Sequence, residues 1–236
     1  MSDFNRNAAA FPGAARTVAV DAGLRAHMIR VYNYMAVGVA VTGVVAYFTN
    51  QYFGQALAGS PMIYVLIFAP LALVFFLSWR IDKLEASTAR ALFFVYAALL
   101  GASLSVIFTV YTDTSITRVF FISAAAFGGL SLWGYTTQRD LTGMGSFLMM
   151  GLIGIIIASL VNIFLKSSGL DWIISVIGVL VFAGLTAYDT QKIKEIYNVN
   201  DDSTVTGRKA VMGALSLYLD FINLFLMLLR IFGARR

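Results

Sequence analysis

The chain has 236 residues, of which 59% are hydrophobic and only 12% are charged, and its mean hydropathy is +0.81. A soluble protein of this size needs more charged surface than that, so the composition excludes a soluble globular domain. The net charge of +5 comes from basic residues spread through short loops, so it does not indicate a nucleic-acid partner. The lack of cysteine excludes disulfides, thiolate-zinc sites and cysteine nucleophiles.

The polar residues 1–25 are predicted to form a mobile N-terminal tail. Residues 26–236 are predicted to form one all-α domain that is integral to the membrane, because long runs without acidic or basic residues each reach the roughly 20 residues that cross a bilayer. In chain order we expect seven transmembrane helices, at about 28–49, 61–79, 89–111, 117–136, 142–165, 171–190 and 210–232. The single histidine, His27, is expected at the membrane interface, since a metal site needs several clustered ligands.

The distribution of basic residues predicts the orientation in the membrane. With seven crossings, twelve Lys and Arg residues lie on the side of the N-terminus and five on the opposite side. Cytoplasmic loops carry the excess of positive charge, so the N-terminus is predicted to be cytoplasmic. Arg230, Arg235 and Arg236 are an exception at the C-terminus, which a re-entrant last helix would bring back inside; we expect seven full crossings.

Asp220 lies in the middle of the last span, with ten uncharged residues before it and nine after it. A carboxylate at the bilayer centre costs roughly 2.5–3.5 kcal/mol on insertion scales, so such a residue faces protein or a water-filled cavity. Helical spacing places it on one polar face together with Gly213, Ser216, Asn223 and Arg230. This pattern predicts that the last helix packs in the centre of the bundle. A purely structural role for Asp220, in a hydrogen bond to Ser or Asn, is the alternative.

Asp189 follows seventeen uncharged residues near the inner end of the sixth span. It is either an interfacial carboxylate paired with Lys192 and Lys194 or a partner of Asp220. Contact with Asp220 requires the sixth helix to continue inward, or the seventh to begin later than Ala210. If the two meet, they share a proton, because two close carboxylates in a low dielectric do not both ionise cheaply. The pair is then a proton sensor.

Arg80 ends the second span on the same side as Asp189. It can form a charge-assisted pair with that aspartate. The alternative is a positively charged membrane anchor grouped with Lys83 and Arg90.

Several motifs resemble those of the Bax inhibitor-1 (transmembrane BAX inhibitor motif) family. The stretch Leu217-Tyr-Leu-Asp-Phe-Ile-Asn-Leu-Phe225 closely resembles its last-helix signature, and Ala187-Tyr-Asp-Thr-Gln-Lys-Ile-Lys194 is similar to its sixth-helix motif. Residues 116–131 and 137–142 are similar to its bacterial branch. The resemblance implies two three-helix layers around a central seventh helix, and a location in a bacterial inner membrane.

The same resemblance implies a calcium leak that responds to pH. It places the family's aspartate pair on Asp189 and Asp220, and the arginine that latches the first aspartate on Arg80. It also implies a possible partner for the bacterial branch, a membrane AAA protease.

Three classes of function compete. The leading hypothesis is a pH-gated leak in which Asp189 and Asp220 bind calcium transiently, with calcium as the permeant ion and no resident cofactor. The second is a non-conducting regulator of membrane proteolysis or stress survival that acts through protein–protein contact.

The third class, an enzyme, is not expected. Tyr188-Asp189 matches half of the signature of intramembrane aspartyl proteases, but the Gly-x-Gly-Asp half is replaced by Leu217-Tyr-Leu-Asp220. A retinal photoreceptor is not expected either, because the seventh span has no lysine for a Schiff base.

Overall fold

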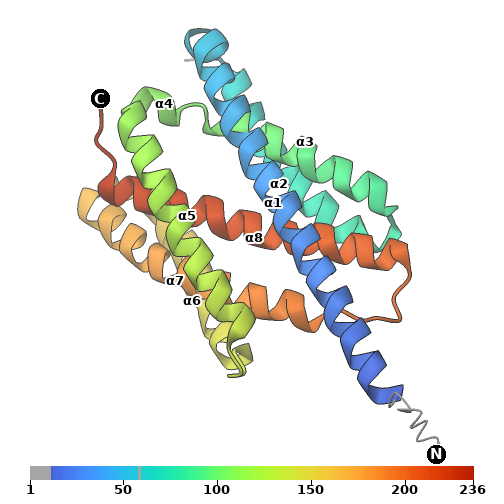
Figure 1. Cartoon of the computed structure of the whole chain (residues 1–236). Coiled ribbons are helices and arrows are strands. Elements are labelled where there is room, and N and C mark those ends of the chain that lie inside the picture. The colour runs from blue at the N-terminus through green and yellow to red at the C-terminus, as the bar shows by residue number, and fades with distance from the viewer. Residues whose placement is uncertain (1–11, 58–59) are drawn as a thin grey trace, which may run out of the picture.

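The computed structural model describes residues 12–57 and 60–236 and is all helical over that part (Figure 1). Seven of its helices are long and apolar enough to cross a membrane. The helices, in chain order, are α1 (Pro12–Leu57), α2 (Met62–Arg80), the short 3-10 helix η1 (Ile81–Lys83), α3 (Ala86–Leu104), α4 (Ile107–Val110), α5 (Asp113–Thr136), α6 (Thr142–Leu165), α7 (Ser168–Glu195) and α8 (Ser203–Phe232). The connections at 81–85, 137–141 and 196–202 lie at one end, which we call the basic end because it carries Lys83, Arg139 and Lys194 nearby.

The helices form two three-membered layers around α8. In one layer α3 packs against α1 and α2, and in the other α7 packs against α5 and α6. The last helix contacts α1, α3, α5 and α7, and it crosses between the two groups in Figure 1. The predicted architecture is therefore confirmed. A stripe of polar residues flanked by Leu, Phe and Met explains the central place, because only a helix that is apolar on most faces is buried on all sides.

Helix ends differ from the predicted spans in ways that matter for the site. α7 continues to Glu195, and α8 begins at Ser203, where the Asp202 carboxylate accepts hydrogen bonds from Thr204 N and Val205 N at 2.7 and 2.8 Å. This N-cap fixes the start of α8 earlier than hydropathy alone indicates.

The first helix also differs from the prediction. It begins at Pro12, so residues 12–25, which were expected in the tail, are helical. Proline is favoured at a helix start, and the alanines and arginine that follow are good helix formers. Residues 1–11 of the predicted tail lie outside the described residues.

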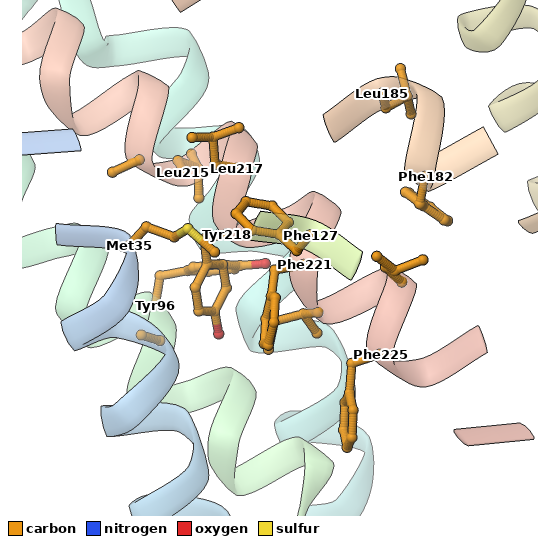
Figure 2. Packing of buried hydrophobic residues seen from close by; sticks show 14 of the residues in the cluster. Met35, Tyr96, Phe127, Phe182, Leu185, Leu215, Leu217, Tyr218, Phe221 and Phe225 are labelled. Atoms are coloured by element: carbon orange, nitrogen blue, oxygen red, sulfur yellow. The ribbon is translucent and has the colours of Figure 1, made fainter. Parts of the chain in front are cut away.

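Aromatic side chains pack α8 against both layers. The Tyr218 ring meets Tyr96 of α3 edge-on, with centroids 5.8 Å apart (Figure 2). It also meets Phe93 of the same helix edge-on, with centroids 5.6 Å apart. On the other side, the Phe221 ring lies 5.6 Å from Phe120 and 5.6 Å from Phe127 of α5. Edge-to-face pairs of this kind add stabilisation beyond buried area. The position of α8 is therefore fixed from two directions.

A buried hydrogen bond holds the polar tip of Tyr218. Its hydroxyl lies 2.6 Å from Thr42 Oγ1 of α1, and Thr42 Oγ1 lies 2.9 Å from the carbonyl oxygen of Ala97 in α3. Thr42 can thus donate to Ala97 and accept from Tyr218, so that three helices are joined at one point.

Gln191 ties α7 to the connection between α5 and α6. Its side-chain oxygen accepts from Leu141 N at 2.9 Å, and its side-chain nitrogen donates to Arg139 O at 2.8 Å. Gln191→Ala should lower the free energy of unfolding by about 1–3 kcal/mol, because it leaves backbone groups without their partner. Thermal unfolding in detergent measures this, with Gln138→Ala, at an exposed residue, as the control. Equal melting temperatures for the two variants would contradict the assignment.

Candidate functional site

Asp189 of α7 and Asp220 of α8 line one cavity of about 530 Å³ between α6, α7 and α8. The polar side of this cavity comes from the two aspartates with Ser216 and Asn223 of α8. The opposite wall is mostly apolar and comes from α6, with Leu152 and Ile155 among its residues. The sequence-predicted pair and the predicted polar face of the last helix therefore face the same space.

The register between α7 and α8 brings the aspartates to one level. A Cβ built on Gly213 would lie 3.1 Å from Ile193, and one built on Gly178 would lie 2.9 Å from Met227. The two antiparallel helices are thus in close contact at both points, and Asp189 and Asp220 both lie between them. The sequence allowed the two aspartates to meet if the sixth transmembrane helix continued inward or the seventh began later. The first of these holds, because α7 continues to Glu195.

The two carboxyl groups line the same cavity from neighbouring helices. Asp220 is only 5% exposed, and its Oδ2 atom has no hydrogen-bond partner among the described residues. Asp189 is partly exposed. Two carboxyl groups in this setting hold one proton between them more readily than they both ionise.

Asp189 does not pair with the lysines that follow it, as the interfacial alternative expects. Lys192 lies over the Tyr188 ring at 5.8 Å, and Lys194 donates to the carbonyl oxygen of Tyr135 at 3.1 Å. Neither forms an ion pair with Asp189 within the described part of the chain.

The whole predicted polar stripe of α8 faces α7. Gly213 packs on Ile193, and at the opposite end Arg230 Nη1 lies 3.4 Å from Asp171 Oδ1. Asn223 donates to the carbonyl oxygen of Leu219 at 2.8 Å, so its side-chain oxygen is the group it offers to the cavity. The stripe is therefore a helix–helix seam with a cavity at its centre.

Arg80, the predicted latch, does not join the aspartates in this conformation. It ends α2 and is exposed, with its guanidinium 5.9 Å from the centre of the Trp79 ring. Because α2 packs chiefly against α3, the arginine lies in the other layer from Asp189. No ion pair between the two exists among residues 12–57 and 60–236.

Sequence reasoning missed a chain of hydroxyl groups beside Asp189. The Tyr32 hydroxyl lies 2.6 Å from Ser131 Oγ, and Ser131 Oγ lies 2.9 Å from Thr190 Oγ1. This chain joins α1, α5 and α7, and its α7 member, Thr190, is the residue that follows Asp189. A signal existed in the sequence, since Ser131 and Thr190 are hydroxyl residues near the inner ends of apolar spans.

The oxygen atoms of the cavity suit weak binding of a hard cation. Ca²⁺ takes 6–8 oxygen ligands, whereas the side chains of the cavity offer two carboxylates, the hydroxyls of Ser159 and Ser216, and one amide oxygen. No third Asp, Glu or His joins the pair to form a metal-binding group within the described residues. The arrangement fits a cation that passes better than one that stays.

Comparisons with known proteins agree with the geometry. The family model for the inhibitor of apoptosis-promoting Bax1 matches residues 24–236. The chain is 50% identical to the inner membrane protein YbhL of Escherichia coli strain K12, over 96% of this chain and 99% of that protein. It is 50% identical to the protein RP147 of Rickettsia prowazekii, over 92% of each, and 40% identical to the membrane protein SpyM3_0260 of Streptococcus pyogenes serotype M3, over 90% of this chain and 94% of that one. With seven apolar helices and relatives named as membrane proteins, the chain is a multi-pass membrane protein. It belongs to the Bax inhibitor-1 family.

Proposed function

We propose that this protein is a pH-sensitive cation leak of the bacterial inner membrane, with calcium as its permeant ion. The observation that supports this most strongly is the meeting of Asp189 and Asp220 in one cavity between membrane-spanning helices. Deprotonation gives the cavity negative charge that attracts a cation, and protonation removes it. The protein thus couples proton concentration to cation passage through one pair of side chains.

Passage requires α7 and α8 to separate. In the present conformation Met227 packs on Gly178 on one side of the pair, and Ile193 packs on Gly213 on the other. These two contacts hold α7 and α8 together on both sides of the aspartate pair along the helix axes. The protonation state of the aspartates would shift a balance between this closed state and an open one rather than switch it completely.

We assign Arg80 to a second closed arrangement in which it pairs with Asp189. An exposed arginine held only over the Trp79 ring is free to move with its helix. Such a pair would compete with the cation for the Asp189 carboxylate. Removing the arginine is therefore expected to raise the leak.

Calcium flux into liposomes tests both assignments. The set consists of the wild type, Asp189→Asn, Asp220→Asn and Arg80→Gln, with Glu195→Gln as the matched control, because Glu195 is an exposed acid on the same helix as Asp189. Each aspartate variant should conduct less and lose its pH dependence, and the control should not change. Unchanged flux and unchanged pH dependence in both aspartate variants would refute the mechanism. An unchanged leak in Arg80→Gln would refute the role of Arg80 as a latch and leave the role of the aspartate pair untouched.

We place the N-terminus and the basic end in the cytoplasm. At the opposite end two arginines are neutralised, because Arg230 pairs with Asp171 at 3.4 Å and Arg236 pairs with Asp113 at 2.7 Å. This removes much of the conflict between the C-terminal arginines and the positive-inside rule. The chain has no cysteine, so single cysteines can be placed cleanly. In intact spheroplasts an impermeant thiol reagent should label Ser167→Cys and not Asn198→Cys; the reverse pattern would invert the topology.

A second candidate function, regulation of a membrane AAA protease by contact, is favoured by the length of α1. Hydropathy predicts that this helix enters the membrane near residue 28, and the helix extends back to Pro12. Figure 1 shows this end of α1 reaching beyond the other helices. Deletion of residues 1–20 followed by pull-down from detergent extract tests it. Loss of the protease with intact flux would support regulation, and an unchanged interaction would exclude this segment as the contact.

A further inference from the structure

A second cavity, of about 330 Å³, lies at the basic end where α1, α3 and α8 meet. Each helix contributes residues about one turn apart, which share one helix face. They are Arg30 and Tyr34 of α1, Ser87 and Arg90 of α3, and Ser203 and Gly207 of α8, with Ala86 at the start of α3. The aspartate cavity shares none of these residues. This second cavity is called the arginine pocket below.

The charged residues that line the arginine pocket are both arginines. Their neighbours at the same end are already engaged: Arg208 donates to Asp82 O, and Lys209 donates to Asp201 and to Ile196 O. In contrast, neither Arg30 nor Arg90 has a side-chain hydrogen bond or an ion pair within the described parts of the chain. Two arginines from different helices thus line one space, and no acidic residue is among the residues that line it.

The start of α3 adds further donors. Its N-cap residue, Glu85, forms no capping hydrogen bond, and the first turn holds no acidic residue. The free N–H groups of a first helical turn attract anions. Gly207 fits against Ala86, since a Cβ there would lie 2.5 Å from the Ala86 Cβ, so α8 closes over this turn. The Ser87 hydroxyl lies 3.4 Å from the Glu85 carboxylate, a long hydrogen bond that a stronger acceptor can replace.

We propose that the arginine pocket binds a phosphate group, carried either by a lipid headgroup or by a soluble ion. Planar guanidinium groups match the oxygens of phosphate in bidentate pairs, and two of them from different helices favour a tetrahedral anion over a single carboxylate. Arg30 directly precedes the uncharged run that begins at Val31, so it is expected at the level where headgroups lie. The bound phosphate would join α8 to the α1–α3 layer.

The test uses the full-length protein, freed of lipid in detergent. Inorganic phosphate and short-chain phosphatidylglycerol are titrated separately while the melting temperature is followed, and potassium chloride of equal ionic strength corrects for general charge screening. The variants are Arg30→Gln and Arg90→Gln, both at exposed residues that should not disturb folding. Arg139→Gln is the matched control, since Arg139 is exposed at the same end and lies outside the pocket.

In the wild type and in Arg139→Gln we expect a saturable rise in melting temperature. Each pocket variant should weaken the affinity by about tenfold, the usual order for a charged hydrogen-bonding partner. Stabilisation by the phospholipid alone identifies a lipid headgroup site, and stabilisation by inorganic phosphate identifies a site for a soluble anion. The proposal fails if neither probe stabilises the wild type beyond the chloride control, or if all three variants lose the response equally. Calcium flux does not enter this test, so its outcome is independent of the leak.

Discussion

Asp189→Asn and Asp220→Asn, combined in one protein, should lower calcium flux by about tenfold, no more than either substitution alone. Each carboxylate attracts a cation about 4 Å away by ~4 kcal/mol per unit of cation charge at the effective dielectric constant of a protein, hence by ~8 kcal/mol for Ca²⁺, before the cost of removing water from the ion. A net loss of ~1.4 kcal/mol is enough for a tenfold effect. Both groups line one cavity, and in the proposed mechanism they share one proton, so the removal of one is expected to disable the site.

The measurement is a double-mutant cycle on calcium flux at fixed pH. If the two aspartates act independently, their effects on flux multiply, and the double variant loses about a hundredfold. If they form a single site, the coupling free energy between the two substitutions is close to the whole effect of one of them. Glu195→Gln, combined with Asp220→Asn, supplies the reference for two acids that do not meet. A hundredfold loss in the double aspartate variant would show that the two carboxylates act separately.

Among glycine-to-alanine substitutions where α5 packs against α7, Gly134→Ala should lower the free energy of unfolding most. A Cβ at Gly134 would lie 2.8 Å from the Cα of Ala187 and still closer to its carbonyl oxygen. Both are backbone atoms, which do not rotate away as a side chain does. Overpacking costs typically 1–3 kcal/mol, and we expect about 3 kcal/mol because two helices have to move apart.

Unfolding of the purified protein in detergent measures this cost. Gly129→Ala on the same helix is the control, because a Cβ there would meet no atom within 4 Å. Alanine is the better helix former by up to ~1 kcal/mol, so the control should be unchanged or slightly more stable. Ala187 precedes the aspartate by two positions, so Gly134→Ala should also lower calcium flux. Equal stability of the two variants would contradict the close approach of α5 and α7.

Much of this fold can be predicted from local patterns in the sequence. Uncharged runs near 20 residues predict the spans, and the polar stripe around Asp220 predicts the central place of α8, because both depend on local composition. The ends of helices were harder to predict. The Asp202 cap and the continuation of α7 to Glu195 depend on single hydrogen bonds and on packing that hydropathy does not register.

The candidate site also has parts that the sequence predicts and parts that it does not. The cost of a carboxylate in lipid singles out Asp220, and helical spacing adds Ser216 and Asn223. The meeting with Asp189 depends on the register of two helices, which the contacts at Gly178 and Gly213 fix. The α6 wall of the cavity and the pairing of Ser131 with Thr190 have no periodic signature, since they arise only when distant segments are brought together. Arg80 remains a prediction that concerns another conformation.

The central claim is that Asp189 and Asp220 form one proton-sharing site. The separation of their carboxyl oxygens, determined by electron cryomicroscopy or crystallography at two pH values on either side of the change in calcium flux, tests it most directly. We predict a separation short enough for proton sharing at the lower pH and a longer one once both groups are charged. A distance beyond about 6 Å at both pH values would contradict the claim, because carboxylates that far apart titrate almost independently.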